Sequence, residues 1–172
     1  LAQGLGMPTK TLPIQACFKQ TKESLLESQG DLQPITEENL QARLRGLLLM
    51  ALANDEQRIL LNTSNKSEAA VGYTTIYGDM CGGLSLLGDV WKSEAYELAQ
   101  HINREEEIIP SNIISKPPSA ELRPNQSDAD ELPDYSALDP FLKEIIEEHK
   151  TLQSSTSTTL SKEEKERVYG LI

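Results

Sequence analysis

The sequence predicts an α/β fold, a parallel sheet flanked by helices. The first observation is the order of the elements, because long amphipathic helical segments alternate with short apolar runs of strand length. The second is the abrupt change after the apolar run Ile59–Leu61, where hydroxyls, amides, a lysine and a carboxylate follow. Open α/β sheets place their ligands just past the carboxyl ends of such strands. Because only two or three strands are recognisable, we expect a thin sheet and an incomplete domain.

Composition limits the classes of partner. The chain has 172 residues, enough for one domain with a core, and its 5% aromatic content predicts an aliphatic core. A formal net charge of −11 disfavours nucleic acid or an anionic membrane as a partner, although small anionic ligands stay possible. Cys17 and Cys81 have no metal-ligand spacing, which predicts two reduced thiols in a cytoplasmic protein. No run has transmembrane length and no signal peptide is present.

The amino-terminal third is predicted to be mainly helical. Thr11–Ile14 is expected to form a short strand, and a helix that Gly30 terminates should follow. The clearest helix has Thr36 as its N-cap and is broken at Asn54 and Asp55. Its apolar stripe should face the core and consists of Leu40, Leu44, Leu47, Leu48 and Ala51.

A predicted strand at 58–61 leads into the stretch on which the rest of the chain depends. Thr63 and Glu68 follow it, and Gly72 and Gly78 mark irregular backbone. One interpretation is a strand, a Thr or Asn helix cap and a loop without function. The other is a ligand site at the edge of the sheet. Spacing alone does not separate the two.

The next helix carries an unusual cation. An apolar run at 84–87 precedes a helix that Ser93 can cap, with Lys92 at its amino-terminal mouth. A helix start favours negative charge, so a lysine there makes electrostatic sense if an anion lies nearby. A lysine that simply points into solvent is the alternative.

The remaining segments have simpler signatures. Residues 110–114 should form one helical turn, and the three prolines within 116–126 exclude regular structure there. A helix with an apolar face is predicted from about Tyr135 to His149. The Ser/Thr-rich run 153–159 reads as a flexible linker, and a capping box at Ser161 starts the last helix.

Familiar catalytic motifs are absent from the sequence. It contains no G-x-x-x-x-G-K-[ST], G-x-G-x-x-G or G-x-S-x-G, and its two histidines lack companions for a zinc site or a triad. What remains is a scattered set able to handle phosphates and a metal: Asn39, Arg43, Thr63, Glu68, Lys92 and Ser119. One carboxylate alone is a weak Mg²⁺ site. The residues by themselves therefore predict no more than an enzyme acting on a phosphate-bearing ligand.

Four segments in order resemble one family. Residues 38–46 (ENLQARLRG), 63–68 (TSNKSE), 77–83 (YGDMCGG) and 118–126 (PSAELRPNQ) are similar to the synthetase domain of glutamine-dependent NAD⁺ synthetase, and the resemblance covers the whole chain. It implies an adenine nucleotide alpha hydrolase-like fold, with 1–150 as a partial ATP pyrophosphatase domain and 151–172 as a linker and helix of the same domain. The implied reaction is ATP-dependent amidation of deamido-NAD⁺ to NAD⁺ through an acyl-adenylate, with release of AMP and pyrophosphate.

The resemblance also implies roles for the scattered set. Thr63, Lys92 and Ser119 match ATP-binding positions of the family. Asn39, Arg43 and Glu68 match positions for deamido-NAD⁺, and Glu68 also matches the Mg²⁺ position. Asp79, Gly82 and Gly83 are expected to shape the substrate loop. No side chain of this chain is implied to be catalytic.

Three family features are missing from the sequence. The Ser-Gly-Gly-x-Asp-Ser phosphate loop, a basic closing segment and the amidase domain that makes ammonia from glutamine are absent. Because the chain also starts with Leu and ends on Gly-Leu-Ile, we expect both ends to be cut from something longer, and this chain alone to be inactive. The resemblance further implies a homodimer or larger assembly. A non-catalytic binding or assembly module is the alternative, and a GMP-synthetase-like enzyme is more distant.

Overall fold

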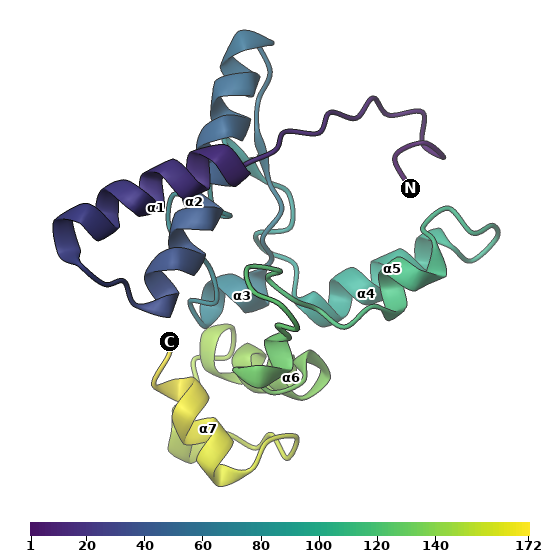
Figure 1. Cartoon of the computed structure of the whole chain (residues 1–172). Helices are drawn as coiled ribbons and strands as arrows, with labels where there is room; N and C mark the ends of the chain where they lie inside the picture. The colour runs from purple at the N-terminus through teal and green to yellow at the C-terminus, as the bar shows by residue number, and fades with distance from the viewer.

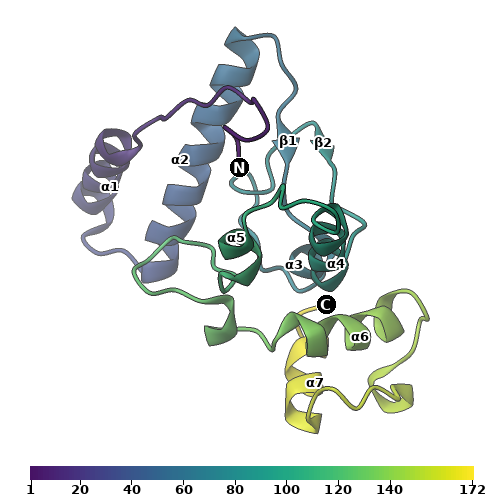
Figure 2. The ribbon, with the colours of Figure 1, turned by 90° about the vertical axis from the view of Figure 1, so that its right-hand side faces the viewer.

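The computed structural model describes residues 1–172 and consists mainly of helices (Figure 1). Two short strands form a parallel sheet among them (Figure 2). Strand β1 pairs with β2 in the register Leu61 to Leu84 and Asn62 to Ser85. The α/β class and the thin parallel sheet are thus confirmed. The elements are α1 (Gln15–Gln29), α2 (Pro34–Asp55), β1 (Leu61–Asn62), α3 (Lys66–Ala70), β2 (Leu84–Ser85), α4 (Lys92–Ile102), α5 (Ser111–Ser115), α6 (Tyr135–Ile146) and α7 (Lys162–Tyr169), with 3₁₀ turns at Asp128–Asp130 and Leu152–Ser154.

Two predicted helix starts are wrong by two to three residues. Helix α2 begins at Pro34 rather than after Thr36, because proline has the helical φ already and its missing N–H is not needed in the first turn. Helix α4 begins at Lys92 with Trp91 as its N-cap, so Ser93 lies inside the helix. The predicted end of α1 is confirmed, since Gly30 follows it with a φ of 82°.

The strand predictions are the least accurate. Thr11–Ile14 forms no strand, and Pro13 has no N–H to give to a ladder. The predicted strand at 58–61 lies later, at Leu61–Asn62, and its apolar residue is not buried: Leu61 is 43% exposed, while the buried residue of the strand is the polar Asn62. Because β2 is the only partner of β1 and each strand has two residues, the sheet covers little apolar surface.

The hydrophobic core surrounds α6, at the end of the molecule where α7 also lies (Figure 2). The predicted apolar face of α6 is confirmed, because Leu138, Phe141 and Leu142 are fully buried. Trp91, at the start of α4, and Val168, on α7, complete the packing around them. The core therefore fixes the start of α4 against α6.

Helix α2 buries a different face from the one predicted. Its buried residues are Ala42 and Gly46, while Leu47 of the predicted stripe is 56% exposed. A β-carbon on Gly46 would lie 2.9 Å from both the Cys81 sulfur and the Gly78 carbonyl oxygen. The loop after α3 thus approaches the backbone of α2 through its smallest side chains, and this contact displaces the leucine stripe from the interior.

The Ser/Thr-rich run 153–159 is tied to the rest of the chain. Glu144 of α6 accepts hydrogen bonds from the hydroxyls of Ser155 and Thr156, both at 2.5 Å, and from the backbone N–H of Ser157 at 3.1 Å. Lys150 pairs with the same carboxylate at 2.9 Å. The predicted helix after Ser161 follows, with the capping box present.

Other sequence expectations can be checked directly. Neither Cys17 nor Cys81 forms a disulfide, as predicted. No helix combines the length and apolar character needed to cross a bilayer. Helix α6 ends at Ile146, three residues before the predicted end at His149.

Candidate functional site

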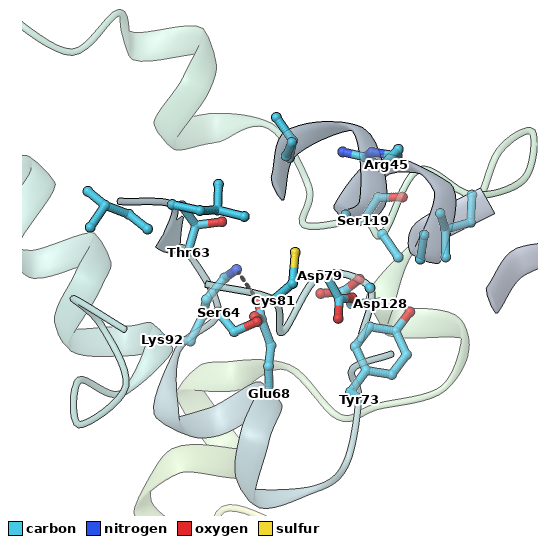
Figure 3. Close-up of a pocket in the computed structure, with 18 residues that line it drawn as sticks. Arg45, Thr63, Ser64, Glu68, Tyr73, Asp79, Cys81, Lys92, Ser119 and Asp128 are labelled. Atoms are coloured by element: carbon cyan, nitrogen blue, oxygen red, sulfur yellow. Dashed lines mark hydrogen bonds and ion pairs between the residues drawn. The ribbon is translucent and has the colours of Figure 1, made fainter. Parts of the chain in front are cut away.

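A cavity of about 300 Å³ lies between α2, the segment from β1 to α3, the start of α4 and the loop 119–128 (Figure 3). Four of the six predicted site residues line it: Thr63, Glu68, Lys92 and Ser119. They come from three segments that are distant in sequence. The polar stretch after β1 is therefore both a helix cap and one wall of a cavity.

Helix α3 positions Glu68 through its first turn. The Asn65 side chain accepts from the backbone N–H of Glu68 at 3.1 Å, and the backbone N–H of Asn65 donates to Glu68 Oε2 at 3.4 Å. This reciprocal capping box leaves Glu68 Oε1 facing the cavity. The sequence interpretation of an Asn cap is correct, and the cap is what directs the carboxylate.

Lys92 meets an anion, as its position at a helix start requires. Its Nζ lies 2.8 Å from Glu68 Oε1, and the two side chains are 22% and 18% exposed. The same ammonium lies 5.4 Å from the centre of the Tyr135 ring. A cation at the positive end of α4 is unfavourable in isolation, so the glutamate compensates both the charge and the helix dipole. A bound phosphate could replace that glutamate.

The loop 75–79 places a second carboxylate, that of Asp79, beside this pair. Asp79 Oδ1 accepts the backbone N–H of Thr75 at 2.7 Å. Burial raises the pKa of Asp79 above its usual value, the Thr75 hydrogen bond opposes that rise, and the negative charge of Glu68 adds to it. The cavity therefore favours cations, or anionic ligands that bring a cation with them.

Asn39 and Arg43 do not reach the cavity. Asn39 Oδ1 accepts the Thr75 hydroxyl at 2.8 Å and lines an adjoining hollow of about 150 Å³. The exposed Arg43 donates from Nε to the Ile76 carbonyl at 3.2 Å. The two residues lie one turn apart, as the sequence predicts, and in this structure they hold neighbouring residues of one loop.

Ser119 shapes the second loop of the cavity. Its hydroxyl donates to the Gln126 carbonyl at 2.6 Å and accepts the N–H of Glu121 at 3.1 Å. Gln41 of α2 donates to the Leu122 carbonyl at 2.8 Å, so the loop rests on that helix. Because its hydrogen is already used, Ser119 contributes here chiefly by closing the loop over the cavity.

Sequence reasoning missed three cavity residues. Arg45, two positions after Arg43, supplies a second cation to the cavity wall. Asp128 is only 4% exposed and accepts the Tyr135 hydroxyl at 2.9 Å, yet its Oδ1 has no partner, nor does the Tyr73 hydroxyl. Burial and the negative charge of Asp128 hold the pKa of both tyrosines well above the usual range. The only signal for Arg45 was its place beside the small residues of α2.

The carboxylates of Glu68, Asp79 and Asp128 line the cavity where a magnesium ion would bind, but the last two already accept hydrogen bonds from the protein. No group of three or more His, Cys, Asp or Glu side chains is arranged to hold a metal. Glu68 alone fits the mode in which Mg²⁺ takes one carboxylate from protein and its other ligands from phosphates and water. The residues therefore do not form a metal site of their own and would hold a metal only where a ligand supplies the remaining oxygens.

Comparisons with known proteins show the family of the chain. The NAD synthase family model matches residues 1–172. A glutamine-dependent NAD(+) synthetase of Synechocystis sp. is 46% identical over 164 residues, 95% of this chain and 29% of that protein. The structure of glutamine-dependent NAD⁺ synthetase from Acinetobacter baumannii in complex with ADP has 36% identity and a TM-score of 0.64, covering 99% of this chain and 30% of that one. NMN synthetase from Francisella tularensis has 30% identity and a TM-score of 0.79, covering 99% and 63%.

These structural neighbours have the adenine nucleotide alpha hydrolase-like fold, which defines the class of this α/β domain. The family model covers every residue, so the assignment can be narrower: the chain belongs to the NAD synthase family. It spans 29% of the length of the Synechocystis sp. relative and 26% of that of Thermotoga maritima.

Proposed function

We propose that this chain forms one wall of the active site of an ATP-dependent ligase that converts deamido-NAD⁺ into NAD⁺. The observation that carries the proposal is the gathering of Thr63, Glu68, Lys92 and Ser119 around one cavity. The ligand in the Acinetobacter baumannii structure, ADP, and the name of the Synechocystis sp. relative support a nucleotide substrate and this reaction. In our proposal, ATP activates the nicotinate carboxylate as an acyl-adenylate, and ammonia then displaces AMP.

Lys92 is assigned to the ATP phosphates. Its ammonium already faces the cavity, where Glu68 holds it at 2.8 Å. A triphosphate carries more negative charge than one carboxylate, so it competes with Glu68 for this cation. Thr63 lies on the same wall with its hydroxyl available to a ligand, and Ser119 closes the loop on the nucleotide side. Arg45 offers a second cation on α2.

Glu68 is assigned to the deamido-NAD⁺ side and to Mg²⁺. Once Lys92 turns to a phosphate, the Asn65 cap still holds the glutamate against the cavity. Bound Mg²⁺ would supply charge neutralisation on the triphosphate as the carboxylate attacks the α-phosphorus. The contribution of this chain is then orientation and electrostatic stabilisation, because no side chain needs to form a covalent intermediate.

Asn39 and Arg43 are assigned to deamido-NAD⁺ through the loop they hold. Asn39 is hydrogen-bonded to Thr75 and Arg43 to Ile76, in the loop that leads to Gly78 and Asp79 at the cavity. Arg43 is exposed, so its remaining guanidinium donors are free for a ligand outside the cavity. A substrate that extends from the cavity over this loop would meet both side chains.

A mononucleotide substrate is the second candidate. The Francisella tularensis NMN synthetase has the higher TM-score of the two neighbours, 0.79 against 0.64. Sequence favours the dinucleotide, because the Acinetobacter baumannii NAD⁺ synthetase is 36% identical and the NMN synthetase 30%. Supplying the mononucleotide and the dinucleotide substrates in the same assay distinguishes the two.

The complete enzyme needs parts that these residues do not supply. In our proposal, a separate amidase domain releases ammonia from glutamine, and the synthetase domains associate as a dimer or larger assembly. The 172-residue chain alone should bind ATP poorly and should not form NAD⁺ from free ammonia. Turnover by the isolated chain at the rate of a full-length relative would contradict this expectation.

A chimera tests the function. We would replace the matching segment of the Synechocystis sp. relative with this chain and measure NAD⁺, AMP and pyrophosphate formed from deamido-NAD⁺, ATP and ammonia. The proposal predicts all three products in equal amounts. A chimera that folds and binds ATP without turnover would instead support a non-catalytic binding module.

A further inference from the structure

A buried carboxylate outside the cavity is left unexplained by the proposed chemistry. Asp139 lies on α6 between the core residues Leu138 and Phe141 and is 1% exposed. Burying a charge among apolar side chains is costly unless strong hydrogen bonds compensate it. The hydrogen bonds that its two oxygens accept therefore indicate which groups the buried charge stabilises.

Both oxygens of Asp139 face the starts of two other helices. Oδ1 accepts the Ser67 hydroxyl at 2.6 Å, and Oδ2 accepts the backbone N–H of Ser93 at 2.8 Å. The Ser67 oxygen in turn accepts the backbone N–H of Lys92 at 2.8 Å. Ser67 is fully buried. One carboxylate and one hydroxyl thus join α3, α4 and α6.

These contacts replace the cap that α4 lacks. Its N-cap residue is Trp91, whose side chain makes no capping hydrogen bond. The N–H groups of Lys92 and Ser93 at the first two helical positions are instead satisfied from other elements, by Ser67 and Asp139. A negative charge at this point also offsets the unfavourable Lys92 ammonium at a helix start.

The two residues next to this junction are the functional pair. Ser67 precedes Glu68 on α3, and the hydrogen-bonded N–H on α4 belongs to Lys92 itself. We infer that Asp139, acting through Ser67, is a positioning residue that fixes the starts of α3 and α4 so that Glu68 and Lys92 meet at the cavity wall. The geometric part stands alone, while its catalytic consequence rests on the proposed function.

Amide hydrogen exchange on the 172-residue chain tests the geometric part. Asp139→Asn puts an amide donor against either the Ser93 N–H or the Ser67 hydroxyl, and Ser67→Ala removes the bridge. We expect exchange at Lys92 and Ser93 to rise about tenfold or more, the loss of one charge-assisted hydrogen bond, with far smaller changes in the rest of α4. If Asp139→Asn does not fold, exchange at Lys92 in Ser67→Ala tests the same junction.

Glu144→Gln is the matched control. Glu144 also lies on α6, is 8% exposed and accepts several hydrogen bonds, but it faces the run 155–157. This variant should speed exchange at Thr156 and Ser157 and leave Lys92 and Ser93 unchanged. Exchange at Lys92 and Ser93 that matches wild type in the Asp139 and Ser67 variants, or that rises equally in Glu144→Gln, overturns the inference.

The chimera tests the catalytic consequence. Asp139→Asn should lower kcat/KM for ATP, but add little when Lys92→Met is already present, because both changes remove the same interaction. Fully additive losses would show a role in stability alone and would overturn the positioning role. If the unmutated chimera does not turn over, the proposed function fails, and the exchange measurement alone decides the position of Lys92.

Discussion

Gly46 sets the distance between α2 and the loop that carries Asp79. A β-carbon there would lie 2.9 Å from the Cys81 sulfur and the Gly78 carbonyl oxygen, closer than real contacts allow. The carbonyl belongs to the backbone and cannot turn away. The width of this part of the cavity therefore depends on one missing methyl group.

Gly46→Ala should destabilise the protein although alanine is the better helix former. The helix preference gains up to about 1 kcal/mol, and the overlap with a backbone carbonyl that cannot move costs about 2 to 3, so we expect a net loss of about 1 to 2 kcal/mol. Urea unfolding measures it. Gly170→Ala is the control, because its β-carbon would lie 3.5 Å from its nearest neighbours in ordinary contact. Equal stability of wild type and Gly46→Ala would contradict the close approach.

The lowered pKa of Glu144 predicts that the stability of the protein depends on pH. Hydrogen bonds from Ser155 and Thr156, together with Lys150, hold the pKa of this carboxyl well below its usual value. A group whose pKa is lowered by folding contributes stability above its unfolded pKa, about 4.3, and loses it as the pH falls toward the folded pKa. Stability should therefore decrease below about pH 5.

Removing the Glu144 carboxylate should make the free energy of unfolding depend less on pH in the acid range. In Glu144→Gln, the free energy of unfolding should be lower than in wild type at pH 7, and the difference should shrink as the pH is lowered. Urea titrations between neutral and acid pH provide the measurement, with the exposed Glu148→Gln as control. A constant difference at every pH would mean that the Ser/Thr run does not depend on the Glu144 charge.

Residue types were predicted better than residue contacts. Thr63, Glu68 and Lys92 could be singled out, because a hydroxyl, a carboxylate or a lysine after a strand or at a helix start is a local signal. Ser119 could be singled out as a hydroxyl in a loop that prolines stiffen. The anion predicted near Lys92 exists and is Glu68. Asp128 could not be found, since nothing local distinguishes its burial from the exposed acidic residues around it.

Helix α3 shows how one element serves both fold and site. Its five residues, Lys66–Ala70, are too few for a stable isolated helix, so its position depends on the Asn65 cap and on tertiary contacts. The capping box uses Glu68 Oε2 and leaves Oε1 for Lys92. Loss of the cap should therefore weaken the fold and misdirect the carboxylate together.

Asn65→Ala should cost about 1 kcal/mol of stability, the usual value of an N-cap. Asn65→Ser keeps a side-chain oxygen for the Glu68 N–H and should lose much less. Thermal unfolding of both variants, with amide exchange at Glu68, provides the measurement. If the alanine and serine variants are equally stable, the cap does not hold α3.

At the level of elements, periodicity predicted helices well and packing poorly. The apolar face of α6 was found because it packs inside this chain. The leucine stripe of α2 was misread because Ala42 and Gly46, not leucines, meet the loop after α3. Close packing on small residues leaves no hydrophobic pattern in the sequence. Strands of two residues leave even less, which explains the error at Thr11–Ile14 and the shift of β1.

The whole molecule has its core at one end and an open cavity beside it. Twenty of 172 residues are buried, most of them near α6, while large aliphatic side chains of α2 and of both strands are exposed. The family could be predicted from four short segments that occur in the order typical of the family, and the structure shows that all four line the cavity. What the sequence could not predict is the junction at Asp139, since Ser67, Ser93 and Asp139 are brought together only by folding.

Lys92 in the active chimera provides the most direct test of the central claim, that the Lys92–Glu68 pair is the functional centre of this chain. Lys92→Met should lower kcat/KM for ATP by roughly 10²-fold, the usual effect of removing one electrostatic contact to the reacting group. Lys143→Met is the matched control, because Lys143 also pairs with α4, at Glu94 at 2.7 Å, but does not line the cavity. We predict a large loss for Lys92 and activity near that of the unmutated chimera for Lys143; equal activity of the two variants would contradict the account.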